Sequence, residues 1–413
     1  MINVLGRILG QARKDGWGSV AAKVLQRTAG KALENLAFTE PTLPVRPEDI
    51  VDFDVLCAAG NPRPRTGSLD VGWVCTPPGP GSGGHTTFFR MVQGMADRGH
   101  RCTLFLYDRN SDDVSRHTST IRQFWPDLDA HVRSVTEGFE GMDAVVASSW
   151  PTAYAAAARR GPDIHSFYFI QDYEPYFYPR GTLYWLAENS YRLGFTNIGL
   201  GEMITAVMKA ETGQEPAASV PFACDTATYR LLETKDGKNT RQGVVYYAKR
   251  AVDRRGYLLA KLALEQFHAM HPEQEIHVYG DRISGWSIPV HNHGNLSPAA
   301  LNELYNRTIT GLAISFTNIS LVPEELLAAG NVPVLNESPF AAQVLSDPDV
   351  LWSPAIPRRL AETLAEAVEA PDISGRAARI AQRQRLDWSA SRECFAAVLE
   401  SVCAKEPGSP RLS

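Results

Sequence analysis

Four cationic side chains follow a short apolar run near the middle of the chain, and residues of this type bind phosphate groups. The run at 243–248 predicts a buried strand, and after it come Lys249, Arg250, Arg254 and Arg255. A guanidinium group can bind two phosphate oxygens at once, and an ammonium group adds a compact charge. The pattern favours a diphosphate site at the carboxyl end of the strand, with a solvated charged loop as the alternative.

A second candidate anion site is the loop at 77–84, which reads Pro-Pro-Gly-Pro-Gly-Ser-Gly-Gly. It joins a predicted strand at 71–76 to a helix predicted to begin near Thr86. Glycines let a ligand approach the backbone closely, and the N–H groups of a helix start attract anions. We therefore expect Gly83 and Gly84 to bind a phosphate or sugar group; the alternative is a plain structural turn.

The same loop also satisfies the dinucleotide pattern G-x-G-x-x-G. The match uses Gly79, Gly81 and Gly84, and Asp108 follows the next predicted strand, where a ribose partner would lie. Two interspersed prolines make the loop longer than a tight dinucleotide turn. A NAD-dependent dehydrogenase is therefore the less favoured alternative.

A third candidate anion site is the polar loop at 315–321, between a predicted strand and a short helix predicted at 324–329. Backbone N–H groups of Ser320 and Leu321 would be available at the helix start. Glu325 lies early in that helix, where a carboxylate can simply interact favourably with the helix dipole.

An acidic pair lies within the aromatic stretch at 167–181. Aromatic faces can stack against the C–H edge of a sugar, and Asp172 and Glu174 can accept hydrogen bonds from its hydroxyl groups. Asp172 follows a predicted strand, which would place it at the carboxyl edge of a sheet. The alternative is that these aromatic residues, Tyr173 among them, belong to the core.

Short apolar runs alternate with helical stretches from residue 71 onward, which is the pattern of β-α-β units. The first set of predicted strands is 71–76, 102–107, 143–148 and 166–170, with helices at 86–98 and 150–160. The second set is 243–248, 275–279, 310–315 and 332–335, with helices at 257–271, 297–307 and 324–329. The fold class is thus α/β, with two Rossmann-like domains that bind ligands at the carboxyl ends of their strands.

Composition and charge exclude several classes of protein. The 413 residues are 44% hydrophobic and 21% charged, which is typical of a folded chain, and the net charge of -5 does not favour binding to nucleic acid. The six cysteines form no C-x-x-C pair, and there is no apolar run long enough for a membrane span or a signal peptide, so we expect a cytoplasmic protein. We expect His291-Asn-His293 to be a loop and not a metal site, because it lacks cysteine or acidic company.

The motifs of the second half resemble the GT-B glycosyltransferases of family GT4. Arg250 and Arg255-Gly256 have the spacing of that family's arginine and lysine-glycine, and 325–334 matches its E-A-M-A-x-G-x-P-V segment. Residues 220–225 and 294–297 resemble its V-P-x-G-V-D and G-x-L-S segments. The resemblance spans about residues 70–400 and implies two facing Rossmann-like domains, with a C-terminal helix that crosses back to the first.

The resemblance also implies roles for individual residues. It implies that Arg250 and Arg255 bind the diphosphate of a nucleotide-sugar donor without a metal or other cofactor, and that Glu325 binds the ribose. The other expected donor-binding residues are Gly83, Gly84, Lys249, Gly294, Asn318, Ser320 and Leu321. The expected acceptor-binding residues are His85, Tyr173 and Glu174, with Asp172 orienting the acceptor hydroxyl or receiving its proton. The family's first glutamate is replaced by Thr317.

The aromatic stretch at 167–181 further resembles WsaF-type rhamnosyltransferases of bacterial surface polysaccharides. This resemblance implies transfer of L-rhamnose from dTDP-L-rhamnose to a growing glycan or lipid-linked glycan, with retention of configuration. The family's first-domain histidine, which meets the donor's 6-hydroxyl, is absent near 171–174, and a 6-deoxy sugar has no need of it. The alternative from another class is a nucleotide-sugar-binding regulatory protein without catalysis.

We expect four parts along the chain. These are an N-terminal helical extension and linker at 1–69, an acceptor domain at 70–235, a donor domain at 236–386, and a crossover helix with a tail at 387–413. Basic and apolar residues alternate at helical spacing over 1–38. Such a helix can lie at the inner membrane surface or dock on its own protein.

Overall fold

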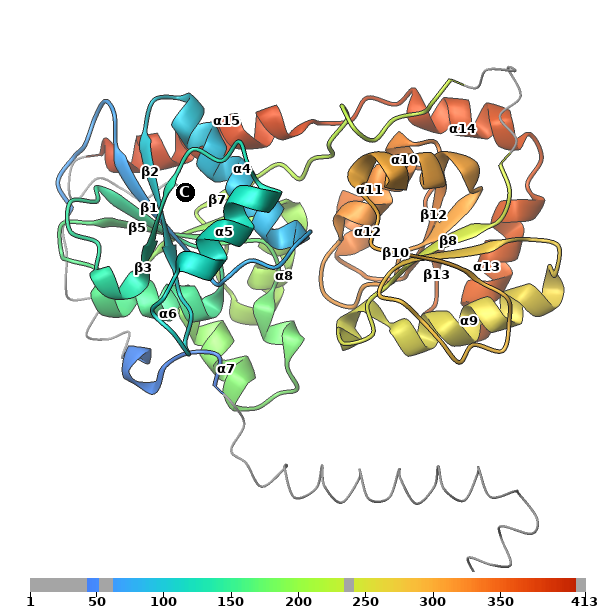
Figure 1. The fold of residues 1–413 in the computed structure, drawn as a ribbon, viewed down its shortest axis with the longest axis horizontal. Helices are drawn as coiled ribbons and strands as arrows, with labels where there is room; N and C mark the ends of the chain where they lie inside the picture. Colours follow the sequence, from blue (N-terminus) through green and yellow to red (C-terminus); the bar gives the residue numbers. More distant parts are fainter. Residues whose placement is uncertain (1–42, 52–61, 234–240, 406–413) are drawn as a thin grey trace, which may run out of the picture. The chain divides into compact units, whose positions relative to one another are not determined.

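The computed structural model describes residues 43–51, 62–233 and 241–405. The helix predicted at 1–38 lies outside the described residues. Within them, two separate parallel sheets are flanked by helices (Figure 1).

The first sheet has seven parallel strands in the order β3-β2-β1-β4-β5-β6-β7. In chain order the strands are β1 (Asp70–Cys75), β2 (Arg101–Leu106), β3 (His131–Ser134), β4 (Ala144–Ala147), β5 (His165–Ile170), β6 (Thr196–Leu200) and β7 (Ala218–Val220). The helices of this domain are α4 (Gly83–Asp97), α5 (Ser115–Phe124), α6 (Trp150–Arg159), α7 (Thr182–Asn189) and α8 (Glu202–Thr212). The central strands are nearly continuous apolar runs, because helices cover a parallel sheet on both faces.

The second sheet has six parallel strands in the order β10-β9-β8-β11-β12-β13. The strands are β8 (Val244–Ala248), β9 (Ile276–Gly280), β10 (His291–Gly294), β11 (Thr310–Leu312), β12 (Val332–Asn336) and β13 (Leu351–Ser353). The helices are α9 (Tyr257–Met270), α10 (Pro298–Arg307), α11 (Leu321–Ala328), α12 (Ala341–Val344), α13 (Pro357–Glu369) and α14 (Ile373–Ala381). The predicted pair of Rossmann-like domains is confirmed, and the chain changes sheet between β7 and β8. The residue at which one domain ends stays a prediction.

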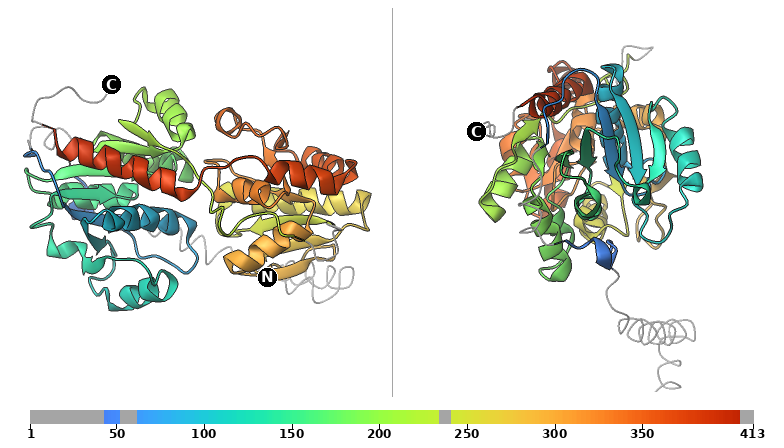
Figure 2. Two further views of the ribbon diagram at one scale, coloured as in Figure 1. Left: turned by 90° about the horizontal axis from the view of Figure 1, so that it is seen from above. Right: turned by 90° about the vertical axis from the view of Figure 1, so that its left-hand side faces the viewer.

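The last described helix, α15 (Trp388–Cys403), returns to the first domain and packs against α4 and β7, as predicted (Figure 2). Its approach to α4 is close: a Cβ atom on Gly94 would lie 2.8 Å from the Cβ of Arg392. At the other end, the carboxylate of Glu400 accepts hydrogen bonds from Arg98 at 2.8 and 2.7 Å. Apolar packing and charge-assisted bonds thus hold α15 on the first domain.

Three local predictions were wrong. The segment His291-Asn-His293 is part of the edge strand β10, where a nitrogen of His293 lies 3.0 Å from one of His277 on β9. Helix α4 begins at Gly83, three residues before the expected Thr86, with Ser82 as its N-cap. Helix α11 likewise begins at Leu321 and not at 324. Both early starts move residues expected in loops into first helical turns.

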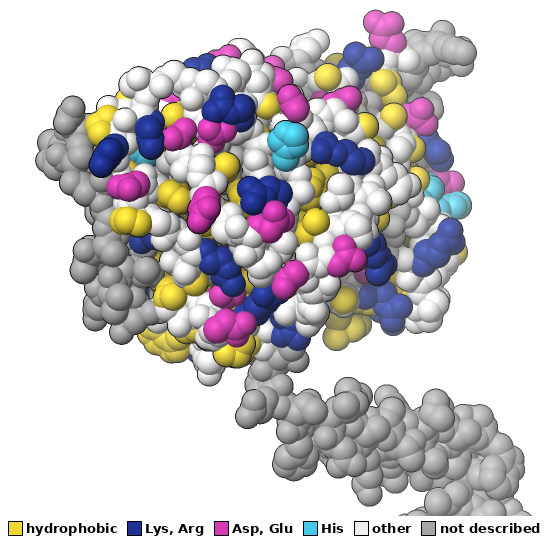
Figure 3. Space-filling model, turned by 60° about the vertical axis from the view of Figure 1, so that its left-hand side comes forward, with side chains coloured by type: hydrophobic (Ala, Val, Ile, Leu, Met, Phe, Trp, Pro, Cys, Tyr) yellow, Lys and Arg dark blue, Asp and Glu magenta, His cyan; other side chains and the backbone are white. Residues whose placement is uncertain are grey.

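Charges of both signs are interspersed on the face shown in Figure 3. On that face no single-sign area dominates. Nothing there resembles the basic stripe that binds a nucleic-acid backbone.

Candidate active site

The cationic loop at 249–255 leaves the carboxyl end of β8 and lies against the loop after β11. Its end is fixed by Gly256, whose φ of +61° lies in the left-handed region. A Cβ atom there would come within 2.6 Å of Ile314, so the close approach of the two loops requires glycine. The N–H of Phe316 donates to the carbonyl of Arg254 at 3.0 Å and joins the loops.

Arg255 is held in one orientation by this second loop. Its guanidinium donates to the Ser315 hydroxyl at 2.8 Å and to the Asn318 side-chain oxygen at 3.2 Å. Burial lowers its pKa to about 10, with the charge of Arg254 acting in the same direction, so it stays cationic at neutral pH. A fixed, partly desolvated cation of this kind interacts strongly with an anion because the local dielectric is low.

Lys249 and Arg250 lie at the same sheet edge beside Asp281. The Lys249 ammonium is 3.5 Å from the Asp281 carboxylate, and the backbone N–H of Arg250 donates to that carboxylate at 2.8 Å. Arg250 is exposed, and its guanidinium lies 5.9 Å from the ring centroid of Tyr257. Lys249, Arg250 and Arg255 thus all follow the carboxyl end of β8 in one loop, and their binding of a diphosphate stays a prediction.

Two helix starts meet close to these cations. Gly83, Gly84 and His85 form the first turn of α4, and a Cβ atom on Gly83 would lie 3.8 Å from the Leu321 side chain at the start of α11. Ser320 is the N-cap of α11. The positive ends of both helix dipoles thus point into one region, which favours a negative group there.

His85 is oriented by two bonds at this helix start. Its Nε2 atom is 2.9 Å from the Thr76 carbonyl, which can only accept, so Nε2 carries the hydrogen. The Nδ1 atom then accepts from the Ser82 hydroxyl at 2.8 Å. Burial lowers the pKa of His85, so the ring is neutral at pH 7. Its predicted contact with an acceptor stays a prediction.

Asp172 follows β5 in the first domain and is buried, with 6% of its surface exposed. Its Oδ2 atom accepts a hydrogen bond from the Thr317 hydroxyl at 3.0 Å and lies 3.5 Å from the guanidinium of Arg254. Its Oδ1 atom is buried and has no hydrogen-bond partner of normal geometry among the described residues. Burial raises the pKa of Asp172, while the charges of Arg254 and Arg255 lower it.

The pair Asp172 and Thr317 joins the two domains, because Thr317 belongs to the loop after β11. Asn318 makes a second bond of this kind, from its side-chain amide to the Gln171 carbonyl at 3.3 Å. Thr317, which aligns with a glutamate of the resembled family, thus bonds to a carboxylate of the opposite domain.

Tyr173 and Glu174 are buried and bonded inside the first domain. The Tyr173 hydroxyl donates to Glu188 at 3.2 Å, and the Glu174 carboxylate accepts from the Trp150 N–H at 2.6 Å and from Tyr168 at 3.2 Å. Burial raises the pKa of Glu174 to about 8. Direct contact of these side chains with an acceptor stays a prediction, and one that their internal bonds do not favour.

Glu325 lies on α11 among buried tyrosines. The Tyr305 hydroxyl is 3.5 Å from its carboxylate and 2.6 Å from the Tyr279 hydroxyl. Burial raises the pKa of Glu325 to about 7, and the charge of Arg90 on α4 opposes that shift. Its neighbour Glu324 is instead paired with Arg385 at 2.7 Å. Glu324 is thus held in an ion pair, while Glu325 is bonded by a tyrosine hydroxyl, and its predicted contact with the ribose stays a prediction.

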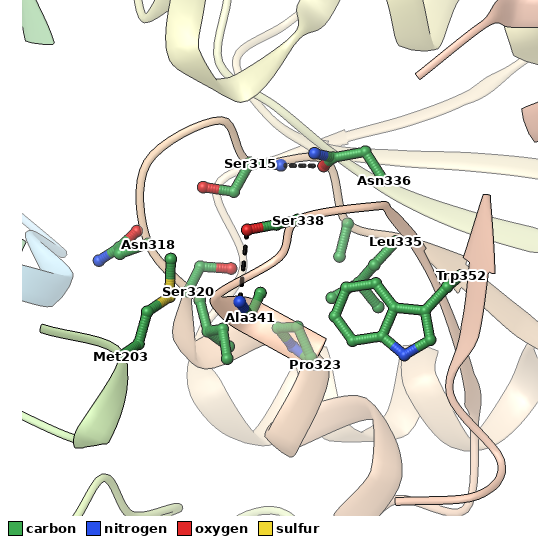
Figure 4. A pocket seen from close by; sticks show the side chains of 12 residues that line it. Met203, Ser315, Asn318, Ser320, Pro323, Leu335, Asn336, Ser338, Ala341 and Trp352 are labelled. Atoms are coloured by element: carbon green, nitrogen blue, oxygen red, sulfur yellow. Dashed lines mark hydrogen bonds between the residues drawn. The ribbon is translucent and has the colours of Figure 1, made fainter. Parts of the chain in front are cut away.

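A small pocket beside α11 shows how the second loop is supported (Figure 4). Ser315, Asn318 and Ser320 contribute to its lining, and the Ser315 N–H donates to the Asn336 side chain at 2.8 Å. Its free volume of about 10 Å³ has room for about one water molecule, so it is too small for a nucleotide. Two of its lining residues, Ser315 and Asn318, are the ones that bond to Arg255.

The predicted donor residue Gly294 ends β10 with a φ of +67°, and a Cβ atom there would lie 3.5 Å from the Arg282 side chain. Residues that sequence reasoning missed are Ser315, which orients Arg255, Gln171, which bonds Asn318, and Arg90, which faces Glu325. Ser315 and Gln171 lie near predicted site residues at strand ends, and that position in the sequence could have identified them as site residues. Arg90 lies in mid-helix and carries no such signal.

Neither a metal cluster nor a membrane-spanning helix is found in the described part of the chain. Across 43–51, 62–233 and 241–405, no group of three or more His, Cys, Asp or Glu side chains could hold a metal ion. None of the helices in these ranges combines the length and the hydropathy needed to cross a bilayer.

Comparison with known proteins adds one curated relative and many solved structures. No family model matches the chain. An O-antigen biosynthesis protein, RfbC of Myxococcus xanthus, is 28% identical over an alignment of 269 residues, and the match covers 61% of this chain and 20% of that protein. The chain thus spans about a fifth of the length of this relative.

Solved structures with a similar fold match the chain at low sequence identity. HepE of Anabaena, solved with UDP and glucose, has a TM-score of 0.61 at 14% identity, over 81% of this chain and 100% of that one. Sucrose-phosphate synthase of Thermosynechococcus elongatus has a TM-score of 0.60 at 12% identity, over 81% and 99%. A glycosyltransferase of Rickettsia africae has a TM-score of 0.59 at 10% identity, over 82% and 100%. With its two parallel sheets and its returning C-terminal helix, this chain has the GT-B fold.

Proposed function

We propose that the chain is a metal-independent glycosyltransferase that transfers L-rhamnose from dTDP-L-rhamnose to a bacterial cell-surface glycan with retention of configuration. The observation that carries this proposal is the site around Asp172. Its buried Oδ1 atom has no hydrogen-bond partner of normal geometry among the described residues, the guanidinium of Arg254 lies 3.5 Å from its Oδ2 atom, and the charge of Arg255 also acts on it. The similarity to an O-antigen biosynthesis protein and to HepE, which has also been solved with UDP-glucose, supports the same class of activity.

In this proposal the second domain holds the donor. Arg255, Arg250 and Lys249 bind the diphosphate, and the backbone N–H groups of Gly83, Gly84 and Leu321 face its oxygens. Negative charge gathers on the diphosphate as the sugar bond breaks, so these groups bind more strongly in the transition state and lower the barrier. The predicted donor roles of Gly294, Asn318 and Ser320 are part of the same proposal.

The acceptor hydroxyl then attacks from the face on which the diphosphate departs, which retains the anomeric configuration. Its oxygen bonds to the anomeric carbon as the bond from that carbon to the phosphate oxygen breaks. The proton of the hydroxyl passes to the departing phosphate or to Oδ1 of Asp172, which needs only hydrogen-bond reach. The missing histidine near 171–174 fits a 6-deoxy sugar such as rhamnose, which has no 6-hydroxyl to bind.

A direct assay tests the proposal. Purified protein is incubated with radiolabelled dTDP-L-rhamnose and lipid-linked glycan, and transfer of label with release of dTDP is the expected result, unchanged by EDTA. A thermal-shift screen across dTDP-, UDP- and GDP-sugars, with NAD as a control ligand, identifies the donor. Binding of a nucleotide sugar without turnover would indicate the regulatory protein, and stabilisation by NAD alone would indicate the dehydrogenase.

Donor affinity should fall as the pH is lowered through 7. A carboxylate can accept hydrogen bonds from both ribose hydroxyls, and its protonated form accepts fewer, so binding favours ionised Glu325. Because the pKa of Glu325 is about 7, the Kd of the nucleotide sugar should rise up to about tenfold between pH 8 and pH 6. Calorimetry on wild type and Glu325→Gln checks this: the variant should bind weakly with a flat profile, and a pH slope equal to that of wild type would contradict the assignment.

A further inference from the structure

An open hollow on the first domain is lined by aromatic rings and two charged side chains. Its lining consists of Tyr176, Tyr178, Arg180, Tyr184 and Glu211, together with Phe316 of the second domain, and its volume is about 420 Å³. This volume falls within the range of about 300–1,000 Å³ that is usual for ligand pockets. Beside it, the ring of Trp185 is 53% exposed and lies 5.9 Å from the ring of Tyr184.

The tyrosines of the hollow are fixed by the core behind them. The ring of Tyr176 packs edge-on against buried Tyr173 at 4.7 Å, and the Tyr178 hydroxyl accepts from the Trp150 indole at 3.1 Å. Fixed aromatic rings lose little conformational entropy when a ligand binds. Phe316 completes the wall, with 48% of its surface exposed.

The polar groups of the hollow match the hydroxyl groups of a sugar. The Tyr176 hydroxyl donates to the Glu211 carboxylate at 2.8 Å, and the guanidinium of Arg180 lies 3.8 Å from that carboxylate. In such a pair the carboxylate can accept a hydrogen bond from one sugar hydroxyl, and the guanidinium can donate one to another. Aromatic faces beside such a pair can stack on C–H edges, whereas the negative charge of Glu211 does not suit an anionic lipid surface.

Two short paths connect the hollow to Asp172. Phe316 immediately precedes Thr317, whose hydroxyl donates to Asp172 at 3.0 Å. Phe177 lies between Tyr176 and Tyr178 in the sequence, and the guanidinium of Arg254 lies 4.4 Å from the centroid of its ring. The same guanidinium lies 3.5 Å from Asp172. A glycan seated in the hollow would therefore have its next sugar beside the proposed catalytic carboxylate.

We propose that this hollow is a subsite for a sugar of the acceptor glycan, one unit away from the sugar that reacts. The inference rests on the proposed function for the identity of the reaction, and on the hollow itself for the binding of sugar. It assigns acceptor recognition to Tyr176, Glu211 and Phe316, which lie on a face open to a long chain.

Saturation-transfer NMR with simple methyl glycosides tests the subsite. With methyl α-L-rhamnopyranoside and methyl α-D-glucopyranoside as probes and dTDP filling the donor site, wild type should transfer saturation to the ring C–H protons of at least one probe. Loss of one stacking face should weaken binding about 2- to 10-fold in Phe316→Ala, and Glu211→Gln should weaken it similarly. Phe124→Ala on α5, where the ring is 44% exposed, is the matched control and should bind as wild type.

The outcomes separate this inference from the proposed function. Absence of saturation transfer in wild type, or equal transfer in wild type, Phe316→Ala and Glu211→Gln, would overturn the subsite whatever nucleotide binds. Sedimentation with anionic vesicles that is lost in Phe316→Ala, without any sugar signal, would assign the hollow to lipid and also overturn it. Failure of wild type to bind any nucleotide sugar would refute the proposed function, while a sugar signal lost in Phe316→Ala would still support the subsite.

Discussion

Asp172→Asn is expected to lower sugar transfer about 10²- to 10⁴-fold, the range typical of a lost acid–base group. The amide has the shape of the carboxylate, so the bond from Thr317 and the contact between domains can persist. It cannot receive a proton, and it places either an N–H group or a weaker acceptor at the buried position of Oδ1. The measurement is the initial rate of label transfer at saturating donor.

The control for this prediction is Asp129→Asn. It removes an exposed carboxylate of the same domain that is distant from Asp172 in the sequence. It should transfer at the wild-type rate. Donor affinity of Asp172→Asn should stay within a few-fold of wild type, since the change does not touch the proposed diphosphate site. Full transfer by Asp172→Asn would refute a role of this residue in the reaction.

Arg255→Ala should raise the Kd of the nucleotide sugar about 10- to 150-fold. A charge-assisted bond to a diphosphate is worth about 1.5–3 kcal/mol, and Arg255 is already oriented by Ser315 and Asn318. Arg255→Lys should recover only part of the loss, because an ammonium group cannot bond to Ser315, Asn318 and phosphate in the geometry of a guanidinium.

Calorimetric titration of the nucleotide sugar measures these constants. Arg358→Ala, which removes an arginine whose side chain is 82% exposed at the start of α13, serves as the matched control. An affinity of Arg255→Ala equal to that of the control would remove the diphosphate assignment, and thermal unfolding of each variant would show whether the fold is intact.

Much of the fold could be predicted because its signals are local. The apolar runs that became β1, β2, β4, β5, β8, β9 and β12 are dense enough to identify from a window of a few residues, and the helices between them are amphipathic. The strand β10 could not be predicted this way, since its sequence His-Asn-His-Gly is polar and its place depends on pairing with His277 in β9. The early start of α4 was missed because glycine and proline normally signal a loop.

In the candidate site, too, the features encoded by neighbouring residues could be predicted, and those that depend on distant residues could not. The clustering of Arg250 and Arg255 at a strand end could be predicted from the sequence, because parallel strands place their carboxyl ends together. The bond between Thr317 and Asp172 joins residues 145 positions apart in two domains, and no local pattern encodes it. Tyr173 and Glu174 show the opposite limit: their residue types suit sugar binding, but only packing reveals that they face Glu188 and Trp150.

The return of the chain through α15 determines how the two domains can move. One crossing follows β7 and the other, at 382–387, leads from α14 to α15, and the Cys224 N–H donates to the Leu386 carbonyl at 3.0 Å. A single connecting segment would allow the domains to rotate in any direction relative to each other. Two connecting segments bonded side by side form a hinge with one preferred axis of rotation. We expect opening about this hinge to break the bonds from Thr317 to Asp172 and from Asn318 to Gln171, so the candidate site would be assembled only when the domains are closed.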